Sequence, residues 1–205
     1  MDIPSLLLAF AVVLASLTVH EWAHAWTADR LGDPTARILG RVSFNPMVHI
    51  DVLGTIVLPL ISMFSGLPIL GWAKPVPVNV SRLGHPKRDF MIVAAAGPAS
   101  NLIMAAIAAA AFNAVTTSET VALSGGPLIL LMAVRINVLL AVFNMLPIPP
   151  LDGGNVLAGL LPDSMGGVIQ GLRQFGFIIL YALMFSGILW RLVDPPTTFI
   201  LELLL

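Results

Sequence analysis

Residues 18–24 read Thr18-Val19-His20-Glu21-Trp22-Ala23-His24 and close an almost purely apolar stretch that begins at Ile3. Helical residues four apart lie one above the other on one face, so His20 and His24 can grip a single metal ion. Glu21 lies one residue round the helix, close enough to touch a water on that ion but poorly placed as a ligand. Polar groups at membrane depth are costly and usually functional, so the stretch predicts a metal site near the end of a membrane-spanning helix. The alternative is two buried histidines that are hydrogen-bonded across a helix bundle.

The composition is that of a multi-span membrane protein. Of the 205 residues, 58% are hydrophobic and 10% are charged, which fits several apolar helices in a lipid bilayer. The formal net charge of -1 gives no indication of a nucleic-acid partner. The chain has no Cys, which excludes disulfides and thiolate metal sites. A transition metal would therefore have to be held by imidazole and carboxylate groups.

The hydropathy pattern predicts an all-α polytopic fold. We expect four full transmembrane helices, at about residues 3–26, 90–115, 128–146 and 171–193. They would form one membrane-embedded domain over residues 1–205, with a core at 5–160, a C-terminal helix at 171–193 and a short tail at 194–205. Residues 37–44 partly alternate between polar and apolar side chains, which predicts a short β-hairpin on the cytoplasmic side.

Two basic segments orient these helices in the cell membrane. Residues 74–88 hold two Lys and two Arg, and residues 27–51 hold three Arg, whereas residues 116–127 hold neither. Both basic segments should therefore be cytoplasmic. Residues 52–78, which Gly and Pro interrupt, must then enter and leave on the same side as a re-entrant helix. The competing interpretation, a full crossing, would leave one basic segment outside. The His20 stretch then lies near the cytoplasmic face.

A second motif follows the third expected span, where residues 144–154 read Asn-Met-Leu-Pro-Ile-Pro-Pro-Leu-Asp-Gly-Gly. Three prolines in four residues predict that the helix breaks before Pro147. Irregular backbone at membrane depth is tolerated only in protein or beside a watery cavity, so the break marks a polar pocket. Asp152 lies on the same side as the histidines and could complete a zinc site, because a catalytic zinc typically has three protein ligands and a water. The alternative role of Asp152 is to cap a short helix from Asn155.

Three motifs together resemble the site-2 protease family of intramembrane zinc metalloproteases, and most closely its minimal branch without a PDZ domain. They are the His20–His24 pentad, Ala96-Gly97-Pro98-Ala99-Ser100-Asn101, and residues 144–154. Residues 45–51 and 71–78 also resemble that branch. The resemblance implies one zinc per chain, bound by His20, His24 and Asp152, with Glu21 as the catalytic base. It also implies that Asn144 helps to hold the substrate or the developing oxyanion.

The expected activity is that of a zinc endopeptidase that cuts transmembrane protein substrates in or near their membrane segment, close to the cytoplasmic face. A substrate helix must unwind before attack, and strand addition to an exposed edge could hold it. Residues 37–44 are favoured over 74–78 as this edge, because Pro75 and Pro77 lack N–H groups. A catalytically idle metal-binding or substrate-holding protein is the second interpretation. A metal transporter is third, since the sequence has no repeated halves.

Two polar residues outside the motifs are also notable. His49 lies near the expected cytoplasmic face and either makes a loop hydrogen bond or contacts the ligands or the substrate. Asn137 lies inside the third expected span and is predicted to hydrogen-bond across the bundle. The sequence carries no indication of the oligomeric state.

Overall fold

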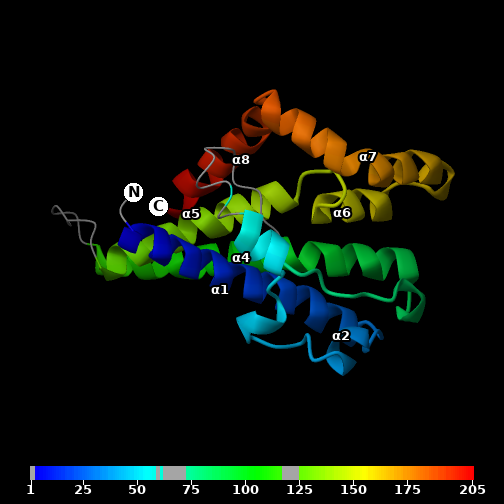
Figure 1. The fold of residues 1–205 in the computed structure, drawn as a ribbon, viewed down its shortest axis with the longest axis horizontal. Helices are drawn as coiled ribbons and strands as arrows, with labels where there is room; N and C mark the ends of the chain where they lie inside the picture. Colours follow the sequence, from blue (N-terminus) through cyan, green and yellow to red (C-terminus); the bar gives the residue numbers. More distant parts are fainter. Residues whose placement is uncertain (1–2, 59–60, 62–72, 117–124) are drawn as a thin grey trace.

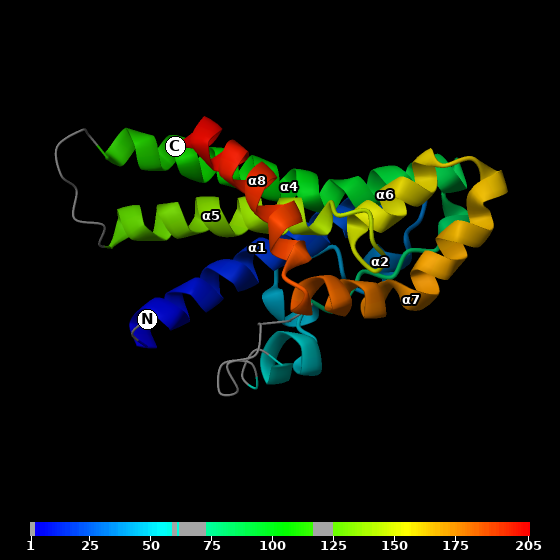
Figure 2. The ribbon, with the colours of Figure 1, turned by 90° about the horizontal axis from the view of Figure 1, so that it is seen from above.

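Three long helices form the centre of the fold. The computed structural model describes residues 3–58, 61, 73–116 and 125–205. Helices α1 (Ile3–Arg30), α4 (Pro86–Val115) and α5 (Gly126–Asn144) lie side by side, with α4 packed against both others (Figures 1 and 2). Helices α7 (Gly166–Phe185) and α8 (Ile188–Leu204) are the two arms of a V above them in Figure 1. Helix α6 (Asp152–Leu160) lies between α7 and α4.

Small side chains bring α4 and α5 close together. Ala105, Ala108 and Ala109 of α4 are buried against Val134 and Val138 of α5. Small residues let membrane helices approach closely, so that backbone and short side chains make the contact. The close approach also lets short polar side chains of the two helices reach each other.

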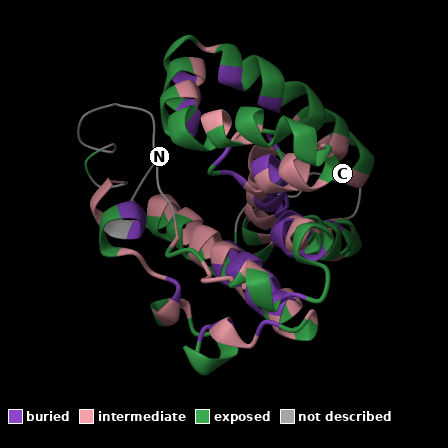
Figure 3. Ribbon diagram, turned by 90° about the vertical axis from the view of Figure 1, so that its right-hand side faces the viewer, coloured by how far each residue is buried: buried purple, intermediate pink, exposed green. Residues whose placement is uncertain are grey.

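The outer surfaces of the long helices are apolar. Four segments are long and apolar enough to cross a membrane: Pro4–Arg30, Pro86–Val115, Gly126–Asn144 and Asp163–Phe185. Large apolar side chains project from them and are exposed, among them Leu7, Ile103, Ile107, Phe177 and Ile178. Figure 3 shows buried residues gathered inside the bundle and exposed ones over its outside. Exposed apolar surface of this extent is typical of contact with lipid. The first three expected spans are confirmed as helices, and a fourth span is present with other bounds than predicted.

The predicted C-terminal boundaries are wrong. In place of one helix at 171–193 and a tail at 194–205, α7 ends at Phe185 and α8 runs from Ile188 to Leu204. Between them, Gly187 has φ +74°, a left-handed conformation that glycine adopts without steric cost. Hydropathy does not register this turn, because the residues on both sides of it are apolar. Pro195 and Pro196 lie inside α8 rather than before a tail.

The predicted β-hairpin at residues 37–44 is also wrong. Residues 35–38 form the short helix α2 (Thr35–Ile38), and the backbone around it bonds locally: Ile38 N–H donates to Pro34 O and Arg41 N–H donates to Ala36 O. Over 37–44, a stretch that the structure describes in full, there is no strand. These local bonds use the donors that a hairpin ladder would need, which outweighs the weak alternation of side chains.

The segment expected to be re-entrant is described only at its two ends. It begins with the short π-helix η2 (Val52–Val57), and residues 59–60 and 62–72 lie outside the described part. Lys74 N–H donates to His49 O at 2.8 Å, so the two described ends of this segment lie together, and the re-entrant helix expected between them falls largely outside the described residues. Residues 73–79, which we call the proline strip, then run without helix or strand towards the start of α4.

The proline-rich break after α5 is confirmed. Helix α5 ends at Asn144, and α6 starts at Asp152 with Leu151 as its N-cap residue. The peptide bond between Pro149 and Pro150 is cis. The break turns the chain so that the first turn of α6 faces α1 and α4.

Candidate metal centre

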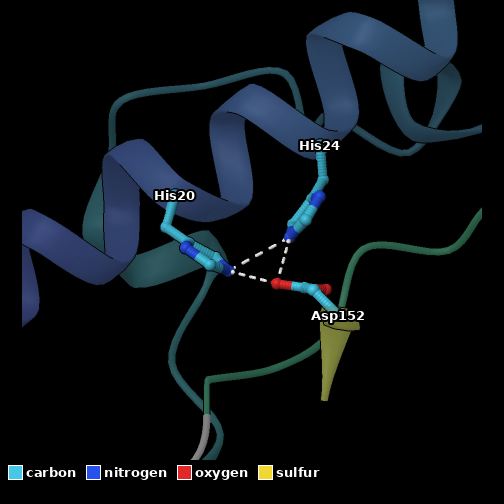
Figure 4. A group of neighbouring side chains, drawn as sticks. All are labelled: His20, His24 and Asp152. Atoms are coloured by element: carbon cyan, nitrogen blue, oxygen red, sulfur yellow. Dashed lines mark hydrogen bonds and ion pairs between the residues drawn. The ribbon is translucent and has the colours of Figure 1, made fainter. Parts of the chain in front are cut away.

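Three side chains from two distant parts of the chain meet at one point (Figure 4). His20 Nε2 lies 3.1 Å from Asp152 Oδ2, His24 Nε2 lies 3.3 Å from the same oxygen, and the two nitrogens are 3.1 Å apart. The histidines come from adjacent turns of α1, and Asp152 comes from the first turn of α6. Both histidines are buried, and the carboxylate of Asp152 is mostly buried.

This triangle has the dimensions of a zinc site. Zinc binds nitrogen and oxygen at about 2.0–2.1 Å in a tetrahedron, which places two ligand atoms roughly 3.3 Å apart. The three observed separations lie between 3.1 and 3.3 Å. Two imidazoles and one carboxylate leave the fourth corner of the tetrahedron for water or substrate.

The hydrogen bonds on the far side of each ring favour a cation at the triangle. His24 Nδ1 lies 2.7 Å from Val93 O, and a carbonyl only accepts, so this nitrogen carries the hydrogen. His20 Nδ1 lies 2.6 Å from Asn101 Oδ1 in the same arrangement. In its neutral form, each ring would therefore turn a lone pair towards Asp152 Oδ2, which is buried and has no hydrogen-bond partner among the described residues. Three lone pairs at this spacing fit a shared positive ion.

Gly97 of α4 lies directly beside the Nε2 atoms of the two imidazoles. A Cβ atom at this position would lie 2.4 Å from His24 Nε2 and 2.6 Å from His20 Nε2, closer than real Cβ atoms come. Gly97 is therefore the residue that lets the α4 backbone approach the site. The side chains nearest to Gly97 are those of the two histidines.

Glycines also position Asp152. A Cβ atom on Gly153 would lie 2.3 Å from Met145 O, and one on Gly154 would lie 2.4 Å from Pro149 N. The chain can thus fold tightly back on the end of α5 and present Asp152 to α1. The capping alternative for Asp152 is wrong, because Leu151 occupies the N-cap position. On α7, Gly176 makes a similar close contact with the Pro149 carbonyl.

Glu21 is buried beside the triangle and is held by the proline strip. The Val76 N–H donates to Glu21 Oε2 at 3.2 Å. Arg41 in turn holds the strip, because its Nη2 donates to the carbonyl oxygens of Lys74 and Pro75. Burial lowers the pKa of the Arg41 guanidinium, and the charge of Glu21 raises it. The strip is further fixed by Asn79 N–H, which donates to the buried carboxylate of Asp33 at 2.6 Å.

A cavity of about 650 Å³ opens beside these residues. It is lined by the triangle and Glu21, by four residues of the proline strip and by three of α7; these are Ala73, Pro75, Val76, Val78, Phe177, Leu180 and Tyr181. Asn144 also lines it, and its Nδ2 donates to Leu140 O at 3.0 Å. His49 is placed differently: its Nε2 lies 2.8 Å from Ser43 O, and its backbone oxygen accepts from Lys74. The loop role of His49 is the one that these contacts support.

Sequence reasoning missed the residues that hold the imidazoles and the glutamate. These are the Val93 carbonyl, Asn101, Arg41 and Val76. Asn101 left a usable signal, because it lies four residues after Gly97 and thus on the same helix face. The others act through backbone atoms or across the fold, and no spacing in the sequence reveals such contacts.

Comparison with known proteins gives the same picture. The profile of peptidase family M50 matches residues 115–186. "Putative zinc metalloprotease YwhC" of Bacillus subtilis is 34% identical over 210 residues, which cover 98% of this chain and 93% of that protein. "Putative zinc metalloprotease Rip2" of Mycolicibacterium smegmatis is 32% identical over 187 residues, which cover 90% of this chain and 69% of the relative.

Rip2 of Mycobacterium tuberculosis is 28% identical over 190 residues. No solved structure matches the chain. The apolar helices and the near full-length relatives agree on a multi-pass membrane protein that is a zinc metalloprotease. The chain belongs to peptidase family M50, the site-2 protease family.

Proposed function

We propose that this protein hydrolyses a peptide bond in or near the transmembrane segment of other membrane proteins, close to the cytoplasmic face of the cell membrane. The observation that carries the proposal is the meeting of His20, His24 and Asp152 beside Glu21, in a cavity among apolar helices. We propose one zinc per chain, with these two histidines and the aspartate as its ligands. The matched spacing of the three ligand atoms supports this assignment.

Each polar group of the cavity has a task in this reaction. A bound zinc would acidify a water molecule and polarise the scissile carbonyl. Glu21 would take the proton of the attacking water and pass it to the leaving amine. The Val76 N–H engages Oε2 of Glu21, which orients the carboxylate so that Oε1 can accept that proton. Asn144 would donate a hydrogen bond to the developing oxyanion, since its amide nitrogen carries a second hydrogen beside the one given to Leu140.

The shape of the cavity suggests how a substrate lies in it. A transmembrane helix keeps its carbonyls in hydrogen bonds, so the substrate must unwind before attack. The edge at 37–44, favoured from the sequence, is not extended, because residues 35–38 form α2. We propose that the unwound segment lies between the proline strip and α7, which both contribute side chains to the lining of the cavity. The apolar residues of α7 would contact the apolar side chains of a membrane segment.

The charge distribution supports the cytoplasmic placement. The basic segments around α2 and at residues 80–88 lie at one end of the long helices, and the N-terminus lies at the other (Figure 1). Basic segments beside membrane helices favour the cytoplasm. The histidines lie towards the basic end of α1, so the cavity would open near the cytoplasmic face.

Glu21→Gln tests the function. The variant should still bind about one zinc per chain but should cleave a reconstituted single-span substrate about 10²–10⁴-fold more slowly, the usual contribution of a general base. The matched control is Glu202→Gln, the same change on an exposed residue of α8, which should cleave at the normal rate. Normal cleavage by Glu21→Gln would refute the assigned base. A wild-type protein that binds zinc but cleaves nothing would favour the catalytically idle alternative.

A further inference from the structure

A buried line of hydrogen bonds leads from α5 through α4 to the metal centre. Asn137 Nδ2 donates to Ser16 Oγ at 3.0 Å and to Ala133 O at 2.9 Å. Asn101 Nδ2 donates to Asn137 Oδ1 at 2.8 Å, and Asn101 Oδ1 faces His20 Nδ1 at 2.6 Å. Ser16, Asn101 and Asn137 are almost completely buried. Asn137 itself touches none of the three side chains of the triangle.

The direction of this line is fixed at its far end. Ala133 O is a backbone carbonyl and can only accept, so the amide nitrogen of Asn137 must face it. The oxygen of Asn137 then faces Asn101 and requires the amide nitrogen there. The oxygen of Asn101 is therefore turned to His20, where it requires a hydrogen on Nδ1. If the Asn137 amide were reversed, its Oδ1 would face the Ala133 carbonyl oxygen, and neither buried atom would have a hydrogen-bond donor.

The two histidines differ in how their hydrogen is placed. His24 Nδ1 meets the Val93 carbonyl, which cannot turn round. His20 meets a side-chain amide, which could turn by half a rotation and offer a nitrogen in place of its oxygen. A donor at that position would leave the hydrogen of His20 on Nε2, the atom that faces Asp152. That tautomer cannot bind a metal through Nε2.

We infer that Asn137 is a positioning residue of the metal centre: through Asn101 it holds His20 in the tautomer with the hydrogen on Nδ1 and the Nε2 lone pair directed at the metal. The inference rests on the proposed zinc site. It extends that site to a residue of α5. It also assigns the direction of the hydrogen bonds in the line to one backbone carbonyl, that of Ala133. Partners behind metal-bound histidines commonly change metal affinity by about 10–100-fold.

Three variants separate orientation from packing. Asn137→Leu keeps the volume but removes the acceptor for Asn101, so zinc affinity should fall by about ten-fold or more. Ser16→Ala is the matched control in the same buried line. The Ala133 carbonyl still orients the Asn137 amide in this variant, so its zinc affinity should stay within about three-fold of wild type. In Asn101→Asp, whichever carboxylate oxygen faces His20 Nδ1 can only accept a hydrogen bond, so no rotation of the side chain offers a donor there. Adding Asn137→Leu to the Asn101→Asp variant should therefore lower zinc affinity little further.

The tautomer can be read without zinc. Nitrogen NMR of the imidazoles in the metal-free protein, which has four His, should show His20 protonated on Nδ1 in the wild type and partly on Nε2 in Asn137→Leu. A wild-type His20 protonated on Nε2 would overturn the inference, even if a variant failed to fold. The inference would also be overturned if Asn137→Leu lowered zinc affinity by the same factor in the wild type and in the Asn101→Asp variant. The effect of Asn137 would then come from packing and not from the orientation of Asn101. Failure of the wild type to bind zinc, with Nδ1 protonated as expected, would instead count against the proposed function.

Discussion

At the scale of single residues, the candidate metal centre depends on Gly97, which has no side chain, as well as on the three side chains that meet there. The two imidazoles occupy the space in which any other residue at position 97 would place its Cβ atom. The α4 backbone at Gly97 thus lies close beside the Nε2 atoms of both rings. The same holds for Gly153, which lets the chain beside Asp152 pass close to the end of α5.

Gly97→Ala should disrupt the metal centre. The added Cβ atom would lie 2.4 Å from His24 Nε2, so the rings or α4 must shift, and overpacking of this kind costs about 1–3 kcal/mol. Zinc affinity, measured by competition with a chelator, should fall about ten-fold or more. Gly126→Ala on α5 is the control, because a Cβ atom there meets nothing within 4 Å. Unchanged zinc affinity in Gly97→Ala would show that the rings can move without losing the metal.

At the scale of elements, the proline strip links the loop after α1 to the proposed base. Its alternate prolines have no N–H, so the Val76 N–H, which reaches Glu21, is the donor between them. Arg41 binds the carbonyls that precede it. The sequence already indicated that these two prolines make the strip a poor β-strand edge, and the structure adds that the one N–H between them is donated to Glu21.

Arg41→Ala should therefore slow cleavage without removing zinc. Loss of the guanidinium frees the carbonyls of Lys74 and Pro75, so the strip and Glu21 are held less well, and misplacement of catalytic groups can cost about 10²-fold. We expect kcat to fall about ten- to hundred-fold with zinc content unchanged. Arg37→Ala is the matched control, since Arg37 is 66% exposed in a surface pair with Asp29 and such pairs contribute little. An Arg41→Ala variant with normal kcat would remove the strip from the mechanism.

The elements also show where sequence reasoning succeeds. Pro147 marks the helix break correctly, because a missing N–H and a ring clash act locally. The hairpin at 37–44 fails because the side-chain alternation there is weak and local turns around α2 compete with it. The helix boundary at Gly187 fails because one left-handed residue leaves no trace in hydropathy. Asn101 was quoted as part of a motif, but its contact with His20 depends on how α4 packs on α1, which no pattern in one helix contains.

At the scale of the whole molecule, the long helices give the protein two distinct ends. The basic segments lie at one end with the histidines, and the N-terminus and the end of α4 lie at the other (Figure 1). This polarity is what the positive charges of the sequence predict for a protein with its site near the cytoplasm. Helix α7, which carries no recognised motif, also contributes side chains to the lining of the cavity.

Cysteine labelling tests this orientation directly, because the natural chain has no Cys. Val115→Cys and His85→Cys place a thiol on exposed residues at opposite ends of α4. In intact cells, a membrane-impermeant thiol reagent should label Val115→Cys, and it should label His85→Cys only after the membrane is opened. The reverse pattern would place the cavity at the outer face.

The triangle joins two residues of α1 to one that follows α5, and this separation has a consequence for biosynthesis. A ribosome-bound chain that has inserted only its first helices holds a pair of histidines and no carboxylate to meet them. The proposed zinc site therefore cannot form until Asp152 has been synthesised and the chain has turned after Pro147. Assembly order alone would keep the hydrolase silent while it is being made.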